Sequence, residues 1–194
     1  VARTDGNIVY FGTDQGEFYA GQQQNDQWTF TDRSGGPLPQ RGVSDIAVSP
    51  TDANVGDVVF NGFSQNTPDQ PGHVFKPVDG GTNWQRLDGT GEAIIPDIPT
   101  LSILLDPENA GHIYVGTDIG VFQSTDDGQT WVNASQGLPP VPVYDLKYIA
   151  PAKQLWAATY GRSILRTTLG EPVPNPTPTF TLVPTRTPAN PTDT

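Results

Sequence analysis

The sequence predicts an all-β fold built from repeated four-strand units, and three observations predict it. The sustained i, i+3, i+4 apolar spacing of a helix is absent, whereas short alternating apolar runs recur between Gly, Pro, Asn and Asp. These runs return in a fixed order, at intervals of roughly 45 to 55 residues. An octapeptide that ends in Trp also recurs at one place in that order.

Each complete unit is expected to hold four strands, here called a to d in chain order. Strand a is expected at 43–48, 100–105 and 143–148; strand b at 7–12, 57–62, 112–116 and 154–158; strand c at 17–19, 72–76, 120–123 and 162–165; strand d begins at Trp28, Trp84 and Trp131. Units of this size are typical of β-propeller blades. We therefore expect three to four blades, with strand a missing from the first unit and strand d from the fourth.

The octapeptide is clearest at 124–131, which reads STDDGQTW. The copy at 77–84 keeps Asp79, Gly81 and Trp84 at the same offsets, and the segment 21–28 keeps only its Trp. Because every copy lies between strands c and d, the pattern indicates a repeated turn of one design.

The segment 124–131 resembles the Asp box, or bacterial neuraminidase repeat. This repeat is found in sialidases, xyloglucan-type glycoside hydrolases, sortilin-like receptors and exported bacterial proteins. The resemblance covers most of residues 5–170, and the segment 137–162 resembles the last blade of such exported proteins. It implies a hairpin between the third and fourth strands of a blade, and an extracellular or cell-surface location.

The residues of this box are expected to stabilise their own turn. Asp126 can accept hydrogen bonds from backbone N–H groups, and Gly128 allows a positive φ. Trp131 would cover the turn with a large ring, while Ser124 and Thr130 close further hydrogen bonds. The alternative is a calcium site that uses the carboxylates of Asp126 and Asp127; the turn interpretation is preferred, so no metal or other cofactor is predicted.

The chain is expected to divide into propeller blades over residues 1–170 and a Pro/Thr-rich linker or stalk over 171–194. The tail has too few apolar residues to offset its ordering entropy. Its Thr-Pro steps suggest O-glycosylation, and the sequence Asn-Ala-Ser suggests N-glycosylation. The candidate glycosylation sites are Asn133, Thr177, Thr179, Thr185 and Thr187.

Composition excludes several function classes. The net charge is −11 and the pI is near 4.3, so the chain repels a phosphate backbone and nucleic-acid binding is not expected. The absence of Cys excludes disulfides and thiolate metal sites. No apolar run is long enough for a membrane span.

The best paired carboxylates are Asp45 and Asp145, which occupy equivalent places in strand a, close to the channel of a propeller. Two carboxylates across a cleft would suit a glycoside hydrolase. The competing interpretation is ordinary polar alternation, since Ser102 stands at the same place in the third unit. His73 and His112 are interpreted as surface or turn residues. The strand-b aromatics (Tyr10, Phe60, Tyr114 and Trp156) are interpreted as core packing between blades, with carbohydrate stacking as the alternative.

The sequence therefore predicts a non-catalytic extracellular β-propeller module with a structural, adhesive or protein-binding role at the cell surface. The alternative is the C-terminal part of a xyloglucanase-like glycoside hydrolase, and a third hypothesis is a receptor-like propeller that binds a peptide in its channel. The incomplete first and last units predict partners that cover open sheet edges. These partners would be missing upstream blades or other protein chains, with a homopolymer and a carbohydrate ligand as further alternatives.

Overall fold

The computed structural model describes residue 2 and residues 5–60, 62, 72–78, 81–169 and 181–183. In this part of the chain the regular structure is almost entirely β-strand, so the predicted all-β class is confirmed. A short 3-10 helix, η2 (Ala150–Ala152), joins two strands. The strands are β1 (Ile8–Gly12), β2 (Phe18–Gln24), β3 (Gln27–Asp32), β4 (Val43–Val48), β5 (Gly56–Phe60), β6 (Val74–Val78), β7 (Asn83–Arg86), β8 (Gly89–Thr90), β9 (Ala93–Ile94), β10 (Thr100–Leu105), β11 (Ile113–Thr117), β12 (Gly120–Ser124), β13 (Val132–Asn133), β14 (Val143–Ile149), β15 (Gln154–Thr159), β16 (Ile164–Thr168) and β17 (Thr181–Leu182).

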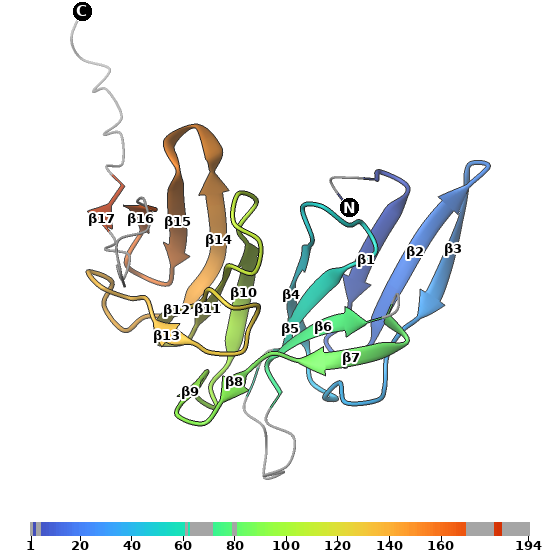
Figure 1. The fold of residues 1–194 in the computed structure, drawn as a ribbon, viewed down its shortest axis with the longest axis horizontal. Coiled ribbons are helices and arrows are strands. Elements are labelled where there is room, and N and C mark those ends of the chain that lie inside the picture. Colours follow the sequence, from blue (N-terminus) through green and yellow to red (C-terminus); the bar gives the residue numbers. More distant parts are fainter. Residues whose placement is uncertain are drawn as a thin grey trace, which may run out of the picture.

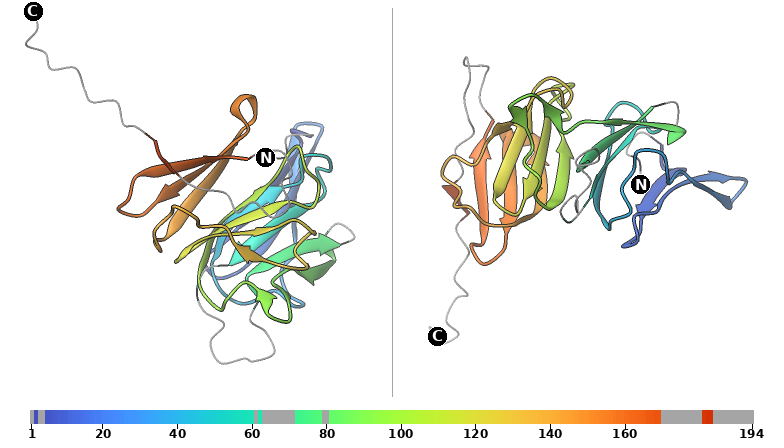
Figure 2. Two further views of the ribbon diagram at one scale, coloured as in Figure 1. Left: turned by 60° about the vertical axis from the view of Figure 1, so that its left-hand side comes forward. Right: turned by 90° about the horizontal axis from the view of Figure 1, so that it is seen from below.

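The strands form four sheets of one design. The first sheet is β1-β2-β3, the second β4-β5-β6-β7, the third β10-β11-β12-β13 and the fourth β14-β15-β16-β17, while β8 and β9 form a separate hairpin. Within each sheet, strands that follow one another in sequence pair antiparallel. The sheets succeed one another across Figure 1 in chain order, and Figure 2 shows the same succession from two other sides.

The inner strands of the second, third and fourth sheets carry the same irregularity. In β4, β10 and β14 the pairing register shifts at the second residue, between Val43 and Asp45, between Thr100 and Ser102, and between Val143 and Asp145. An extra residue at such a bulge bends the strand and increases its twist. The three inner strands contact one another in sequence, β4 against β10 and β10 against β14.

The core lies between consecutive sheets. Strands β5 and β11 are buried along their whole length, because the second and third sheets are covered on both faces. Strand β3 of the first sheet is exposed along its whole length. The apolar residues gather at three interfaces: Phe18, Val58, Phe60, Phe75 and Trp84 between the first and second sheets; Val59, Val74, Ile103, Ile113, Val115 and Trp131 between the second and third; and Tyr114, Val121, Leu146, Leu155 and Ala157 between the third and fourth.

The expectation that the fourth unit lacks strand d is wrong. Residues Thr181 and Leu182 of the Pro/Thr-rich tail form β17, which pairs with Arg166 and Leu165 of β16. The edge of β16 offers unpaired backbone groups, and the short run of Thr, Leu and Val between prolines can extend along it. The division into 1–170 and 171–194 otherwise stays a prediction, because most of the tail lies outside the described residues.

Two further details differ from the expectations. Phe60 faces the first sheet, whereas Tyr10 faces the second and Tyr114 faces the fourth, so the strand-b aromatics do not all occupy one equivalent place. The hairpin of β8 and β9 was not predicted. No helix in the described residues has the length and apolar character needed to cross a bilayer.

Candidate functional site

Asp45 lies in the bulge of β4 and is held by backbone groups on two sheets. Its Oδ1 accepts a hydrogen bond from the N–H of Ile46 at 2.8 Å, and its Oδ2 accepts one from the N–H of Ile103 at 3.0 Å. Because Ile103 lies on β10, the carboxylate joins the second sheet to the third. The neighbouring Ser44 adds a hydrogen bond from its Oγ to the carbonyl of Thr100 at 2.5 Å.

Asp145 lies at the equivalent bulge of β14, but its surroundings differ. Its Oδ1 lies 3.0 Å from Nζ of Lys147, and 48% of its side chain is exposed. The third sheet separates β14 from β4, because β10 contacts both strands. The structure therefore does not bring Asp45 and Asp145 together as a facing pair.

The box residues form one hydrogen-bonded turn between β12 and β13. Ser124 Oγ donates to Asp126 Oδ1 at 2.8 Å and accepts from the N–H of Gly128 at 2.9 Å. Asp126 also accepts from the N–H of Thr130 at 2.9 Å and from its hydroxyl at 2.6 Å. Slight burial acts to raise the pKa of Asp126, but the hydrogen bonds from Thr130 and Ser124 hold that pKa below its ordinary value.

The carboxylate of Asp126 therefore accepts its hydrogen bonds from residues of the turn in which it lies. The carboxylate of Asp127 points elsewhere, to Lys76 on β6. Among the described residues, no group of three or more His, Asp or Glu side chains is placed to hold a metal ion. The glycines allow the backbone to turn: Gly128 has φ +80° and Gly81 of the second copy has φ +83°.

The tryptophans of the repeats connect each sheet to the one before it. The indole N–H of Trp84 donates to the carbonyl of Arg33 at 3.1 Å, and that of Trp131 donates to the carbonyl of Leu87 at 2.6 Å. Arg33 directly follows β3 and Leu87 directly follows β7, so the two bonds are equivalent. The second and third sheets are therefore each joined to the preceding sheet by the same indole-to-carbonyl hydrogen bond.

Some of the predicted residues are not part of this turn. Asn133 lies on β13, where its Oδ1 accepts a hydrogen bond from the N–H of Ser135. Asp79 and the tail residues Thr177, Thr179, Thr185 and Thr187 lie outside the described residues.

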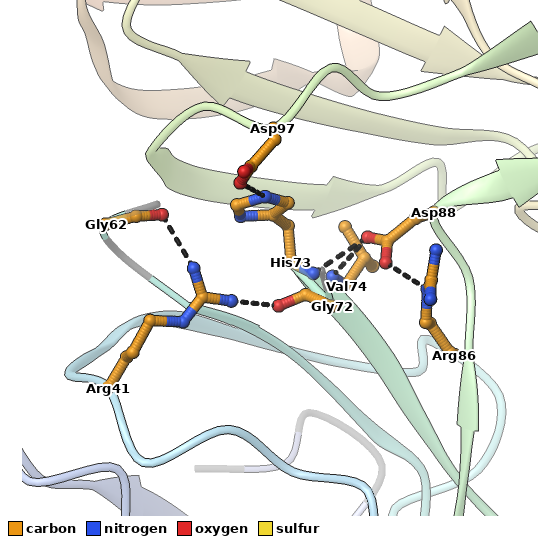
Figure 3. A network of polar contacts seen from close by, with 8 residues as sticks. All are labelled: Arg41, Gly62, Gly72, His73, Val74, Arg86, Asp88 and Asp97. Atoms are coloured by element: carbon orange, nitrogen blue, oxygen red, sulfur yellow. Dashed lines mark hydrogen bonds and ion pairs between the residues drawn. The ribbon is translucent and has the colours of Figure 1, made fainter. Parts of the chain in front are cut away.

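A polar network centred on His73 lies where the second sheet meets the segment that leads to the third (Figure 3). His73 Nε2 lies 3.0 Å from Asp97 Oδ1, while Asp88 Oδ1 accepts hydrogen bonds from the N–H groups of His73 at 2.8 Å and Val74 at 3.0 Å. Arg86 Nε lies 2.6 Å from Asp88 Oδ2. His73 is 1% exposed, so its interpretation as a surface or turn residue is wrong.

Burial determines how this network titrates. It lowers the pKa of His73, although the carboxylates of Asp88 and Asp97 act in the opposite direction. It also raises the pKa of Asp88, against the hydrogen bonds from His73 and Val74. A neutral imidazole beside a carboxylate is the pairing that general bases use. Because Asp97 lies in the segment before β10, the network connects the second sheet to that segment.

Arg41 extends the network to the segment before β4. Its guanidinium donates hydrogen bonds to the carbonyl of Gly62 at 2.7 Å and to the carbonyl of Gly72. Figure 3 shows Arg41 reaching Gly62 and Gly72 from the side opposite Asp88. The sequence contained no signal for this network beyond isolated polar residues in separate loops.

The open face of the first sheet carries a row of aromatic rings. Phe11 stacks on Tyr19 with centroids 4.9 Å apart and meets the edge of Phe30 at 5.6 Å, while Trp28 stacks on Phe30 at 6.1 Å. Phe30 is 53% exposed and Trp28 is 39% exposed. Four neighbouring aromatic rings on one open sheet face are unusual for a free surface and are typical of an interaction site.

No protein-family model matches the sequence, and no curated protein is similar to it in sequence. Solved structures do match. The GH74 xyloglucanase from Xanthomonas campestris is similar with a TM-score of 0.61 and 14% identity, over 87% of this chain and 28% of that one. The β-propeller domain of Cps50 (Swd1) from Myceliophteria thermophila has a TM-score of 0.62 and 9% identity, over 91% of this chain and 54% of that one.

The chain folds as β-propeller blades. A third similar structure is the extracellular domain of a proposed hybrid two-component system from B. thetaiotaomicron, with a TM-score of 0.59 and 15% identity, over 87% of this chain and 20% of that one. The chain thus spans between a fifth and about half of the length of these proteins. At such low identity the likeness concerns the fold, since one propeller fold hosts many functions.

Proposed function

We propose that this chain is a non-catalytic extracellular β-propeller module, with a structural or protein-binding role at the cell surface, whose outer sheets bind further sheets of the same kind. The observation that carries the proposal is the open aromatic face of the first sheet. Trp28 is the second residue of β3, as Trp84 is the second residue of β7. Trp84 packs against the preceding sheet, so Trp28 lies on the face where a preceding sheet would pack.

The hydrogen bonds of the repeats support the same conclusion. Trp84 and Trp131 donate their indole N–H groups to the chain segment that follows strand d of the preceding sheet. Among the described residues none accepts a hydrogen bond from the indole of Trp28. A further sheet would supply that carbonyl and bury the rings of Phe11, Tyr19 and Phe30.

The outer face of the fourth sheet is the one on which a following sheet would pack. Trp156 occupies the place of Tyr10 and Tyr114, whose rings face the following sheet. The guanidinium of Arg166 lies 6.0 Å from the centroid of the Trp156 ring. Lys147 lies opposite Trp156 on the same face, where its charge is balanced by Asp145 at 3.0 Å, so Arg166 supplies the remaining positive charge. On the first sheet Asp32 pairs with Tyr19 and lies on the aromatic face, so opposite charges would meet if such faces packed together.

Photo-cross-linking tests the proposal. A benzoylphenylalanine at position 28, in protein produced by its own source, should capture a peptide that follows strand d of a propeller sheet. The same residue at position 119, on an exposed turn of the third sheet, serves as the control and should capture no such peptide. A captured peptide from this chain would show that a second copy supplies the sheet, and a peptide from other sequence would show that further blades do. Capture of polysaccharide alone, or of nothing, would overturn the proposal.

The alternative is part of a glycoside hydrolase, which the likeness to a GH74 xyloglucanase favours. Such an enzyme needs two free carboxylates on either side of a scissile bond. Both oxygens of Asp45 accept backbone hydrogen bonds, which argues against a catalytic role. Release of reducing sugar from xyloglucan decides between the two: we expect none from the wild-type chain, and activity that disappears in both Asp45→Ala and Asp145→Ala would support the hydrolase.

A further inference from the structure

A cavity of about 300 Å³ lies between the second and third sheets, away from the aromatic face of the first sheet. Two turns border it, 49–55 between β4 and β5 and 105–113 between β10 and β11. The tip of the box turn reaches it with Asp127. A space of this size is comparable to the smaller binding sites for organic ligands, which begin at about 300 Å³.

The unusual feature of the cavity is Asp57. This residue lies on β5, lines the cavity and is 1% exposed. Its Oδ1 is buried and has no hydrogen-bond partner among the described residues. Buried carboxylates are normally paired, because an unpaired charge in the interior is strongly unfavourable. This oxygen is therefore available to a donor that the described residues do not supply.

The one ammonium group at the cavity is already engaged. Lys76 Nζ lies 2.8 Å from each carboxylate oxygen of Asp127, so its hydrogen bonds go to the box turn rather than to Asp57. The other acidic side chains of the lining are Asp106 and Glu108. Four carboxyl groups therefore line the cavity. Two of them are paired, Asp127 with Lys76 and Glu108 with Lys153 at 3.7 Å, so the carboxyl groups of Asp57 and Asp106 leave an acidic excess that favours a cationic ligand.

The lining also determines which cation fits. No group of three or more His, Asp or Glu side chains in the described part of the chain could hold a metal ion, so the cavity is not arranged as a metal site. Leu105 and Ile113 add apolar surface beside the carboxylates. A carboxylate next to aliphatic side chains suits a cationic head on a short alkyl chain.

We propose that this cavity binds an organic monocation, an alkylammonium or alkylguanidinium, whose N–H groups donate to the carboxylate of Asp57. The alkyl part lies against Leu105 and Ile113. This chemistry occurs both in free amines and in the Lys or Arg side chains of a partner protein. The proposal does not depend on the sheet docking proposed above, because the cavity and the aromatic face are formed by different sheets.

Titration of the full chain with n-butylammonium and n-butylguanidinium at pH 8, followed by NMR shifts and calorimetry, tests this inference. We expect saturable binding with shifts at Lys76, Leu105 and Ile113, and no binding of n-butanol, which has the same alkyl chain without the charge. Asp57→Asn should weaken cation binding at least tenfold, since it removes about 1.4 kcal/mol or more of interaction. Asp26→Asn, on an exposed hairpin of the first sheet, removes the same charge elsewhere and should bind like the wild type.

The same titration distinguishes a free amine from a Lys side chain of a partner protein. Acetyl-Gly-Lys-Gly-amide that binds as tightly as n-butylammonium would indicate a side chain of a partner protein, whereas its exclusion would indicate a free amine. Equal binding of n-butylammonium by wild type and Asp57→Asn would overturn the proposal. So would equal binding of n-butanol and n-butylammonium, or the absence of saturable binding.

Discussion

Replacing Asp57 with Asn should stabilise the chain at high pH. Burial raises the pKa of Asp57 from 3.8 to about 7, with Lys76 acting to lower it and Asp127 acting to raise it. The folded state therefore binds the proton more tightly than the unfolded state does. A difference of about 3 pKa units, at ~1.36 kcal/mol for each, corresponds to about 4 kcal/mol of unfolding free energy.

The sign follows from this difference in proton binding. The stability is fully present below the unfolded-state pKa near 4 and is lost as the pH rises through the folded-state pKa of about 7. Asn is neutral at every pH, like protonated Asp, so the variant should resemble the wild type at pH 4 and exceed it by about 4 kcal/mol at pH 8.5.

Urea unfolding at pH 4 and at pH 8.5 measures this difference, with the fluorescence of the buried Trp131 as the signal. Asp26→Asn is the control for the loss of one negative charge and should show a small change that is similar at both pH values. An equal effect of Asp57→Asn at the two pH values would contradict a raised pKa of Asp57 in the folded state. So would a destabilised variant at pH 8.5, because that result would mean that Asp57 is paired in solution.

Four other substitutions test the contacts between and within the sheets. Trp131→Phe leaves the carbonyl of Leu87 without its indole donor and should lower the unfolding free energy by about 1–3 kcal/mol in urea; a smaller loss would mean that this bond is weak. Gly128→Ala places a Cβ 2.6 Å from the Cβ of Leu87 at a φ of +80°, so thermal unfolding should shift down clearly, and an unchanged midpoint would contradict the turn geometry. Asp45→Ala removes two hydrogen bonds to backbone groups and should cost about 1–3 kcal/mol. Asp145→Ala breaks only an exposed ion pair, for which about 0–1 kcal/mol is typical, and a larger loss there than at Asp45 would reverse our interpretation.

The sequence predicted the strand order well, because each strand has alternating apolar residues and ends at a turn. Strand d in the third sheet is an instructive case: it is only two residues long, yet Trp131 marked its start. The Trp contributes through its ring and its hydrogen bond to Leu87, which do not require a long strand. A pattern formed by residues that are close together in the sequence can be recognised in a single sequence, without knowledge of the fold.

Features that depend on distant residues were not predictable in the same way. Strand β17 lies in a segment whose Pro content favours an extended tail, and the unpaired edge of β16 decides its place. His73 looked like a turn residue because it follows Gly72. Its partner Asp97 lies in a different loop, so no local pattern marks the contact between them.

The candidate carboxylates show the same limit. Alternation placed Asp45 and Asp145 at equivalent positions, and the structure has both of them at bulges of inner strands. Their environments differ because Asp45 faces another sheet while Asp145 lies on the outer face of the last one. Asp57 carried no sequence signal, since a polar residue at the start of a strand is normally exposed.

Hydroxyl-radical footprinting tests most directly whether a further sheet covers the first one. It compares the rate at which Trp28 is modified in protein taken from its native source with the rate in the purified 194-residue chain. We predict that Trp28 and Phe30 react several-fold more slowly in the native material, because a further sheet covers them, while the exposed Ile119 reacts at the same rate in both. Equal rates for Trp28 in the two samples would mean that the aromatic face stays open in the working protein. That result would contradict the claim that the first sheet is a docking face for another sheet.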